Sequence, residues 1–530
     1  MSDTSRTRPL GAQISHMLKS RGVDTIFGIP GVHNQEMYRG IEEAGIRHLL
    51  ARHEQGAGFM ADGYARASGK PGVAYVITGP GLCNAMTPMG QAYSDSVPLL
   101  VLSSCLDDTA ATRGQLHQML DQQAAGATVS DWSHTAGSAA AAYTLIDRAL
   151  SEFQTKRART KHIQVPIAQL EGEAEPAPET PPQTTRVRHV MPDGIAERIK
   201  AAKRPLFILG GGAVRASQEA RRALLTLKAA SLPTDAGRGI ISVSGDPLHY
   251  GGYLGRPETA AVAGSADLVV VVGSELSETD LWRAKLEHEA DMIRVDIDPE
   301  TLGQEPGSIA VQMDANDFFT ELNTALEGHE ANTSWTADEV AKARKRWRAE
   351  ADSERPGIAR VCDALREVMP EDTMYFSDMT QFAYAGKGFW DMERPGHWHH
   401  PYGFGTLGYA LPAGIGGAAA RPGLPTVVIA GDYGFQYTVQ ELGTAVELGQ
   451  PLPILLWDNG KLKEIEDSMV AAQIAPNSVI AHNPDFCALA KAYGAAAAAP
   501  KSLKELQEAV TQAFKTDGPT LIYMTANMAD

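Results

Sequence analysis

The stretch PTVVIAGDYGFQYTVQELGTAVELGQPLPILLWDNGK, residues 425–461, decides the fold that the sequence predicts. Two short apolar runs, 426–430 and 453–457, are typical of buried parallel strands. Residues 439–448 carry apolar side chains at helical spacing, so we expect a strand, helix, strand unit. Such a crossover places its two strands side by side and parallel. Their carboxyl ends then share one edge of the sheet, where open α/β sheets bind ligands.

Each of these two strands is followed by a turn that carries an oxygen ligand. Asp432 offers a carboxylate and Asn459 an amide oxygen. We expect both to bind one Mg²⁺, with the backbone carbonyl of Lys461 as a third ligand and with positions left for diphosphate oxygens. The residues around Asp432 should line the same cofactor site: Gly431, Tyr433 and Gly434. Taken singly, Asp432 is explained as a helix cap and Asn459 as part of a turn, but the combination favours a metal site.

The rest of the chain is organised in three parts. Its 530 residues are too many for one hydrophobic core, and we expect domains at 1–170, 190–330 and 350–530. Polar stretches separate them, an extended linker over 171–189 and a helix with a connector over about 327–357. Strand-like runs alternate with helical ones, so the predicted fold class is α/β with three doubly wound parallel sheets.

Composition narrows the class of protein. A hydrophobic content of 43% and a charged content of 21% describe a globular protein, and neither a signal peptide nor a membrane-spanning run is visible. The 4 cysteines form no CxxC pair and fit a reducing compartment, so we expect a cytoplasmic protein. The formal net charge of −17 argues against nucleic acid and membrane surfaces as partners. A small molecule remains as the expected partner.

A second motif lies in the N-terminal segment, RHEQGAGFMADGYAR at 52–66. It predicts a helix with small residues on one face and Glu54 in the first turn. On its own, Glu54 is explained as a carboxylate that complements the helix dipole.

Together these motifs resemble those of the thiamine-diphosphate-dependent 2-oxo acid decarboxylase and acetolactate synthase superfamily. The superfamily has a GDG turn followed at this spacing by NN, and the chain has GDY at 431–433 and DN at 458–459. Tyr433 and Asp458 are therefore departures. The resemblance covers nearly the whole chain, and within the superfamily it is greatest to bacterial decarboxylases of 5-guanidino-2-oxopentanoate. It is also carried by GIPGVH, VITGPG, MGQAYSDS and GTLGYALPAG.

The resemblance implies thiamine diphosphate and Mg²⁺ as cofactors. It implies that Glu54 shares a proton with N1′ of the aminopyrimidine ring, and that Pro80 and Asn84 lie near this ring. In the C-terminal segment it implies that Thr380 and Gln381 lie in a turn facing the diphosphate. It also implies that the Gly405 carbonyl accepts a hydrogen bond from the 4′-amino group and that Leu407 supports the bent cofactor. In isolation, the glycine-rich stretch at 403–413 fits packing against a helix equally well.

The middle segment contains a glycine run, GGGAVR at 210–215. It is not a dinucleotide fingerprint, because Arg215 stands where the third glycine of GxGxxG would fall. We interpret it as structural. Acetolactate synthase relatives hold FAD in this domain. FAD is therefore an alternative here, although we expect the domain to lack it.

Four further residues are predicted to contact the substrate. By resemblance, His117 corresponds to a site histidine of pyruvate decarboxylase, and Val32 and His33 line the opposite wall. Glu464 stands where relatives place an apolar pocket residue, so we expect it to contact a cationic substrate tail or to donate a proton. The alternatives are a surface loop for His117 and a solvated helix face for Glu464.

These observations predict an enzyme that decarboxylates a 2-oxo acid to an aldehyde and CO₂, with 5-guanidino-2-oxopentanoate as the candidate substrate. One alternative is a carboligase of the acetolactate synthase type. Another is a catalytically inactive regulatory homologue, which the departures at Tyr433 and Asp458 leave open. The resemblance also implies a homodimer or homotetramer with the site at the subunit interface, where Glu54 of one chain meets the cofactor held by another.

Overall fold

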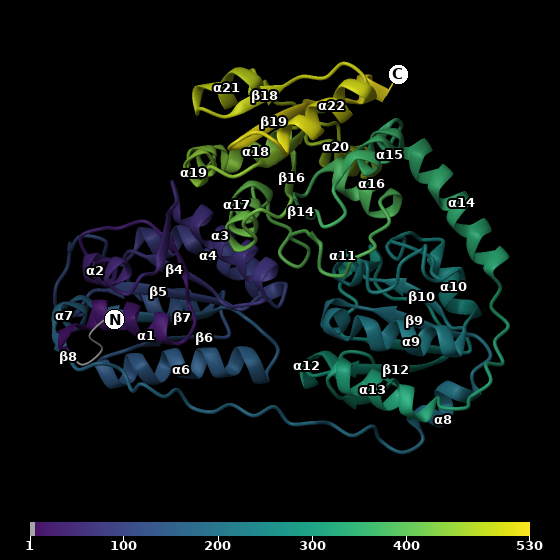
Figure 1. The fold of residues 1–530 in the computed structure, drawn as a ribbon, viewed down its shortest axis with the longest axis horizontal. Helices are drawn as coiled ribbons and strands as arrows, with labels where there is room; N and C mark the ends of the chain where they lie inside the picture. Colours follow the sequence, from purple (N-terminus) through teal and green to yellow (C-terminus); the bar gives the residue numbers. More distant parts are fainter. Residues whose placement is uncertain (1–5, 530) are drawn as a thin grey trace.

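The computed structural model describes residues 6–529 and has three lobes (Figure 1). The N-terminal domain lies at lower left, the central domain at lower right and the C-terminal domain at the top. Each contains one large sheet in which all neighbouring strands are parallel. The predicted α/β class with three doubly wound parallel sheets is confirmed.

In the N-terminal domain the strand order is β3-β2-β4-β5-β7-β6. These strands are β3 (Arg47–Leu50), β2 (Thr25–Gly28), β4 (Gly72–Val76), β5 (Leu99–Cys105), β7 (Lys161–Pro166) and β6 (Trp132–Thr135). The helices are α1 (Leu10–Ser20), α2 (Gln35–Glu43), α3 (Glu54–Ser68), α4 (Pro80–Ser94), α5 (Gln122–Ala127), α6 (Ala139–Thr155) and α7 (Ile167–Glu171). A short antiparallel pair, β1 (Arg8–Pro9) with β8 (Glu173–Ala174), ties the start of the domain to its end.

In the central domain the order is β10-β9-β11-β12-β13. The strands are β10 (Ala230–Pro233), β9 (Pro205–Leu209), β11 (Leu268–Val272), β12 (Asp291–Asp296) and β13 (Ile309–Gln312), and the helices are α8 (Ile195–Ala201), α9 (Ser217–Leu227), α10 (Thr259–Ser265), α11 (Glu278–Leu281), α12 (Pro299–Leu302) and α13 (Ala315–Ala325). The glycine run forms a 3₁₀ helix over Gly211–Ala216. A Cβ on Gly210 would lie 2.1 Å from the Gly273 carbonyl oxygen, so tight backbone packing accounts for this glycine.

In the C-terminal domain the order is β15-β14-β16-β17-β19-β18. The strands are β15 (Trp398–His399), β14 (Met374–Ser377), β16 (Thr426–Gly431), β17 (Leu452–Trp457), β19 (Pro519–Met524) and β18 (Ala496–Ala498). The helices are α14 (Ala337–Glu354), α15 (Ile358–Val368), α16 (Gln381–Phe389), α17 (Ala410–Ala420), α18 (Asp432–Tyr437), α19 (Leu442–Leu448), α20 (Lys463–Ala471), α21 (Phe486–Ala492) and α22 (Leu503–Ala513). β16 and β17 are buried along their full length, which explains their continuous apolar runs.

The extended linker predicted for 171–189 begins later than expected, because Glu171 ends α7 and Glu173–Ala174 form β8. Residues 175–192 have no regular secondary structure and run below the N-terminal and central domains (Figure 1). α14 then runs up the right-hand side to the C-terminal domain. Among residues 6–529, no helix has both the length and the apolar character needed to cross a bilayer.

One predicted helix differs from the structure. Instead of a single helix over 439–448, α18 begins at Asp432, and a 3₁₀ turn over Val439–Glu441 separates it from α19. The break lies at Thr438, whose hydroxyl donates to the Gly408 carbonyl at 2.8 Å. As a result Asp432 is the first residue of a helix, directly after β16.

The N-terminal and C-terminal domains share one hydrophobic core, formed where α3 packs against α17. Glycines allow this close approach. A Cβ on Gly63 would lie 2.0 Å from the Ala413 carbonyl oxygen, and one on Gly416 would lie 1.9 Å from that of Met60. The small-residue face of 52–66 is therefore a helix-packing surface, which fixes the orientation of Glu54 at the start of α3.

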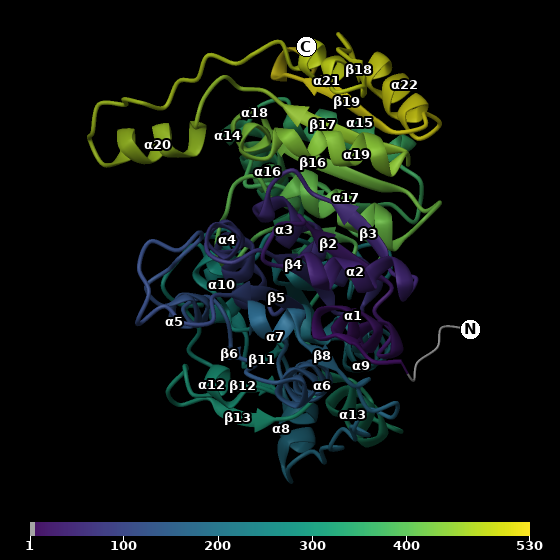
Figure 2. The same ribbon diagram turned by 90° about the vertical axis from the view of Figure 1, so that its left-hand side faces the viewer.

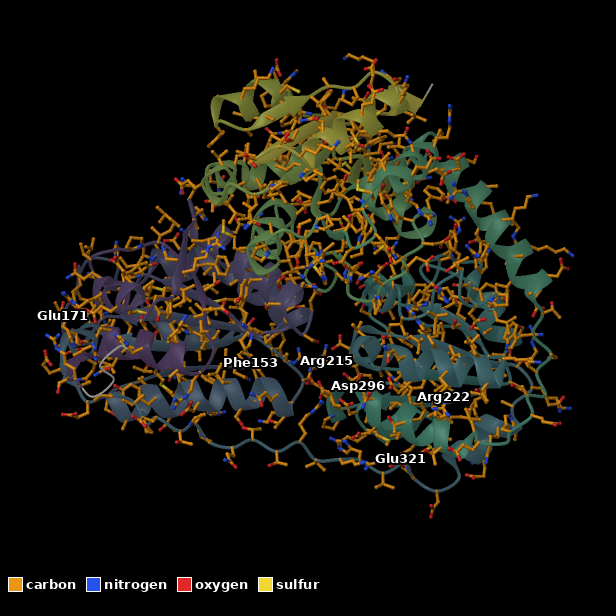
Figure 3. All side chains as sticks on the ribbon, viewed as in Figure 1. Phe153, Glu171, Arg215, Arg222, Asp296 and Glu321 are labelled. Atoms are coloured by element: carbon orange, nitrogen blue, oxygen red, sulfur yellow. The ribbon has the colours of Figure 1, made fainter. Side chains whose placement is uncertain are left out.

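The boundary between the N-terminal and central domains is ionic instead. Figure 3 labels Phe153 on α6 and Asp296 at the end of β12, on the two sides of this boundary. Just beyond α6, Arg157 pairs with Glu275 and, at 3.3 Å, with Asp298. Burial raises the pKa of Asp296, and the nearby Arg157 opposes this rise.

Candidate active site

The turns after β14, β16 and β17 meet at one edge of the C-terminal sheet. Ser377 is in register with Ile429, and Gly431 is in register with Trp457. A Cβ on Gly431 would lie 2.9 Å from the Thr380 hydroxyl oxygen, so the first two turns are in contact. The prediction that the carboxyl ends of these parallel strands share one edge is confirmed.

Asp432 and Asn459 offer oxygen ligands at this edge. Asp432 is 3% exposed, and its Oδ2 accepts a hydrogen bond from the Asn483 amide at 2.6 Å. Burial raises the pKa of Asp432 to about 6, and the charge of Asp458 adds to this rise. The Asn459 Oδ1 accepts the Lys461 N–H at 3.2 Å. A hard cation fits these oxygens, because it would compensate a buried carboxylate that has no cationic partner in the described chain.

Residues 6–529 contain no group of three His, Cys, Asp or Glu side chains that could hold a metal ion unaided. A cation at Asp432 and Asn459 would therefore need further oxygens from the backbone or from a bound ligand. Mg²⁺ is suited to such a site because it takes few protein ligands and completes its shell with phosphate oxygens and water.

A cavity of about 870 Å³ opens at the same edge, between the C-terminal and central domains. Its wall includes all the residues predicted from the C-terminal segment: Thr380, Gln381, Gly405, Leu407, Gly431, Asp432, Tyr433, Gly434, Asn459, Lys461 and Glu464. α16 begins at Gln381 and α18 at Asp432, so two helix N-termini lie in this wall. Their free N–H groups favour an anion such as a diphosphate.

Asp378 supports the cavity wall, a role that sequence reasoning did not assign. Its buried carboxylate accepts the N–H groups of Met379 and Gly408, each at 2.9 Å. A Cβ on Gly434 would lie 2.7 Å from its Oδ2. Burial raises the pKa of Asp378 to about 6, and backbone hydrogen bonds oppose this rise. Asp378 thus holds the loop that carries Leu407 against the turn at 431–434.

Asp458, one of the two departures from the superfamily motif, also has a structural role. Its Oδ1 accepts the Gly460 N–H at 2.8 Å and the Asn483 amide at 2.9 Å, and its Oδ2 accepts the Tyr523 hydroxyl at 2.8 Å. Asn483, which lies in a distant loop without any motif, therefore bridges Asp458 and Asp432. The other departure, Tyr433, has its ring centre 5.9 Å from that of Tyr437.

The residues predicted from the N-terminal segment form a second group. The Asn84 amide donates to the Glu54 Oε2 at 2.9 Å. The rings of His33 and His117 lie 4.9 Å apart, edge to face, and burial together with His117 lowers the pKa of His33. Pro80, the first residue of α4, and Val32 are exposed.

Two features of the histidine pair indicate room for a ligand. Within the described part of the chain, the buried Nδ1 atoms of His33 and His117 have no hydrogen-bond partner. His117 also has a φ of +62°, an uncommon conformation for a residue with a side chain.

The two groups do not meet within one chain. The cavity wall consists of residues of the central domain, α14 and the C-terminal domain, and no residue of the described N-terminal domain belongs to it. Glu54 is therefore not part of the cavity wall that contains Asp432.

Glu441 connects α3 to the C-terminal domain, and its role was also missed from the sequence. Its buried carboxylate accepts the N–H groups of Arg52 and His53, at 3.1 Å and 3.0 Å. These are the residues that lead into Glu54. Burial raises the pKa of Glu441 to about 7, although the hydrogen bonds from the Arg52 N–H, the Thr444 hydroxyl and the His53 N–H oppose this rise.

Comparison with known proteins agrees with this architecture. The N-terminal TPP binding domain, the central domain and the C-terminal TPP binding domain of thiamine pyrophosphate enzymes match residues 8–125, 193–322 and 378–524 respectively. A probable 2-ketoarginine decarboxylase of Pseudomonas aeruginosa is 42% identical, over 98% of this chain and 94% of that protein. The acetolactate synthase isozyme 2 large subunit of Escherichia coli is 28% identical, over 97% and 95%. The superfamily resemblance inferred from the motifs is confirmed.

The raised pKa of Glu441 predicts a pH effect on stability. Its ordinary pKa is 4.5 and its folded pKa is about 7, so between these values the folded state binds more protons than the unfolded state. Stability contributed by this group therefore falls as pH rises from 4.5 to 7, by up to about 3 kcal/mol. Glu441→Gln should remove this fall. Thermal melting at pH 4.5 to 8 should show wild type losing Tm relative to the variant across this range.

Glu508→Gln is the matched control, because Glu508 lies exposed on α22. The Tm of this variant should follow that of wild type across the pH range. A constant difference between wild type and Glu441→Gln would show that Glu441 does not titrate in this range.

Proposed function

Because the chain belongs to the family of thiamine pyrophosphate enzymes, we propose that it decarboxylates a 2-oxo acid to an aldehyde and CO₂. The observation that carries this proposal is that Asp432, Asn459, Gly405 and Leu407 line the same cavity at the edge of a parallel sheet. The relative that is 42% identical is a probable 2-ketoarginine decarboxylase, which supports 5-guanidino-2-oxopentanoate as the substrate.

In this proposal the C-terminal domain holds the cofactors. Asp432, Asn459 and the Lys461 carbonyl hold Mg²⁺, and the N-termini of α16 and α18 bind the diphosphate of thiamine diphosphate. The Gly405 carbonyl accepts a hydrogen bond from the aminopyrimidine, and Leu407 supports the bent cofactor. When bound, thiamine diphosphate supplies the electron sink that the loss of CO₂ requires.

The N-terminal domain supplies the proton chemistry. Glu54, held by the Asn84 amide, keeps a proton at N1′ of the aminopyrimidine, and Pro80 contacts the same ring. His33, His117 and Val32 face the substrate. The unpartnered Nδ1 atoms of the two histidines leave them free, when protonated, to donate a hydrogen bond to the substrate carboxylate.

We also propose that the active unit is at least a homodimer, in which Glu54 of one chain reaches the cavity of another. Two exposed apolar surfaces support this. One surrounds the N-terminal group and includes Val32, Leu116 and Leu120, which are 61%, 61% and 92% exposed. The other lies on the arm formed by α20 and the loop after it, which projects from the body in Figure 2. Its members are Ile465, Val470, Ile474 and Ile480, all at least 50% exposed.

Glu464 is a proposed substrate contact whose charge is already paired. It lies in the cavity wall, and its carboxylate accepts the Arg355 guanidinium at 3.0 Å. This pair argues against a freely solvated helix face. It also means that a substrate cation at Glu464 would have to displace Arg355, whereas proton donation would not.

The remaining elements of the proposal follow from composition. The net charge and the free cysteines Cys83, Cys105, Cys362 and Cys487 fit a cytoplasmic enzyme with a small-molecule substrate. The glycine run of the central domain packs against Gly273, so no observation favours a flavin there.

The decisive experiment supplies the protein with thiamine diphosphate and Mg²⁺ and offers it a panel of 2-oxo acids. We expect CO₂ and an aldehyde, with 5-guanidino-2-oxopentanoate as the preferred substrate. A product with a new carbon–carbon bond would instead identify a carboligase. Release of CO₂ from none of the acids would favour a catalytically inactive homologue.

Removing the metal carboxylate should abolish cofactor retention. We expect Asp432→Ala to weaken binding of Mg²⁺ and thiamine diphosphate by more than about 100-fold, because loss of even an outer-shell partner costs 10- to 100-fold. Titration calorimetry and metal analysis measure this directly. Asp458→Asn is the control, because asparagine keeps an acceptor for Gly460 and should retain both cofactors. Undiminished binding in Asp432→Ala would exclude the assigned metal site.

Mixed oligomers should recover activity that neither parent has. Glu54→Gln should retain the cofactor but lose about 100- to 10,000-fold in turnover, and Asp432→Ala should not bind the cofactor. In a dimer with shared sites, random exchange of the two inactive chains restores about one quarter of the wild-type activity. Unmixed parents under the same exchange conditions are the control. A mixture that has exchanged subunits, shown by mass spectrometry, and yet stays inactive would mean that each site is built from one chain.

A further inference from the structure

The charges in the cavity wall are not balanced. Its six carboxyl groups are those of Asp235, Glu258, Asp280, Glu354, Asp432 and Glu464. Four have a cationic partner in the structure. Arg256 pairs with Glu258 and Glu354, Lys387 pairs with Asp235, and Arg355 pairs with Glu464. Within residues 6–529, Asp280 and Asp432 have no cation within the 4.0 Å of a salt bridge. The proposed Mg²⁺ would pair with Asp432. Asp280 is then the cavity carboxyl group for which no cation has been identified.

Asp280 lies at the central-domain end of the cavity, on the short helix α11. Its Oδ2 accepts the Ser277 hydroxyl at 2.8 Å, and its Oδ1 accepts the Asp235 N–H at 3.3 Å. A carboxylate can accept about four hydrogen bonds, so acceptor capacity remains. Lys387 lies beyond salt-bridge distance of Asp280, and its ammonium group pairs with Asp235 at 2.5 Å. Burial raises the pKa of Asp280 to about 6 and Asp235 adds to this rise, whereas the Ser277 hydroxyl, the Asp235 N–H and the charge of Lys387 oppose it.

Two aromatic side chains, Trp282 and Tyr384, lie in the same cavity wall as this carboxylate. Trp282 lies in the same cavity wall and is 59% exposed, and its ring centre is 6.3 Å from that of Tyr384. Trp282 has a φ of +50°, a conformation that costs free energy for any residue with a side chain. Planar cations such as guanidinium bind to an aromatic face beside a carboxylate, because the ring and the charge act together.

α16 forms one wall of the cavity, from Gln381 beside Asn459 to Lys387 beside Asp235. The helical rise over these six residues is about 9 Å. The metal turn and the pair Asp235 and Asp280 therefore lie at different ends of this wall.

We propose that Asp280 and Trp282 form the binding site for the positively charged end of the 2-oxo acid, at the far end of the cavity from Asp432. This assignment rests on the proposed decarboxylase function and adds the element that selects the substrate. The guanidinium supplies the missing counter-ion of Asp280 with paired hydrogen bonds, and its flat face lies on the indole of Trp282. A neutral 2-oxo acid leaves Asp280 uncompensated and therefore binds less well.

The assignment differs from one at Glu464. Both carboxylates lie in the cavity wall, but Glu464 already has the guanidinium of Arg355. Binding a second guanidinium there gains little, because the pair with Arg355 must first be broken. Asp280 needs no such exchange.

Steady-state kinetics on the loaded enzyme tests the assignment. With 5-guanidino-2-oxopentanoate, Asp280→Asn should raise KM by about 10- to 100-fold, the range expected when a hydrogen bond to a charged group is lost. With 2-oxohexanoate, a neutral acid, KM should change less than about twofold, because no cation is involved. Trp282→Leu should raise KM several-fold for the guanidino acid. Glu258→Gln is the matched control, since Glu258 is a cavity carboxylate that is already paired, and it should leave the preference unchanged.

A binding measurement keeps this test separate from catalysis. Titration calorimetry of the holoenzyme should detect 1-butylguanidine more strongly than its neutral analogue 1-butylurea, and Asp280→Asn should abolish the difference. Circular dichroism and melting verify that the variant is folded. A preference that survives in Asp280→Asn but disappears in Glu464→Gln would overturn the assignment in favour of Glu464.

The two proposals fail in different ways. If the wild type releases CO₂ from no 2-oxo acid, the decarboxylase proposal fails, while the butylguanidine titration still reports on Asp280. If neutral acids are decarboxylated as well as the guanidino acid, and butylguanidine binds no better than butylurea, only the assignment of Asp280 and Trp282 is overturned.

Discussion

A carboxylate taken out of water must be met by hydrogen-bond donors or by a cation, and the site of this protein is organised around that constraint. Asp378 and Glu441 are met by backbone N–H groups, which turn two buried acids into braces for the Leu407 loop and for the start of α3. Asp280 accepts one hydroxyl and one N–H, Asp432 accepts one side-chain amide, and neither has a cation within salt-bridge distance in the described chain. We therefore propose that these two acids bind ligands, a metal ion at Asp432 and the cationic end of a substrate at Asp280.

The close packing of α3 on α17 explains why the site is divided. Gly63 and Gly416 bring the two helix backbones into direct contact and merge the cores of the N-terminal and C-terminal domains. This rigid contact fixes Glu54 relative to its own C-terminal domain, at a place away from the cavity. In the proposed dimer each chain would supply half a site at each of two surfaces, and burial of the exposed apolar residues would favour the association.

Because the cavity lies between the central and C-terminal domains, the proposed tail site gives the central domain a part in substrate choice. Its sheet carries no predicted site residue, yet α11 and the segment after it close the far end of the cavity with Asp280 and Trp282. The cofactor end and the tail end of the cavity therefore belong to different domains. Under this proposal, such a division would let the chemistry stay constant while the central domain sets the charge of the acceptable substrate.

The sequence by itself determined the three parallel sheets and the edge at which Asp432 and Asn459 meet, because strand periodicity and short motifs are local properties of the chain. The catalytic role of Glu54 stays a prediction from its motif. It did not reveal Asn483, Asp378 as a brace, Glu441 or the unpaired Asp280, since each acquires its role from partners far away in sequence. Whether a carboxylate is paired depends on which side chains the folded chain brings within a few ångströms. Glu464 shows the difference: its position in the cavity wall was predicted from the motif, but its partner Arg355 was decided only by the packing of α14 against the C-terminal domain.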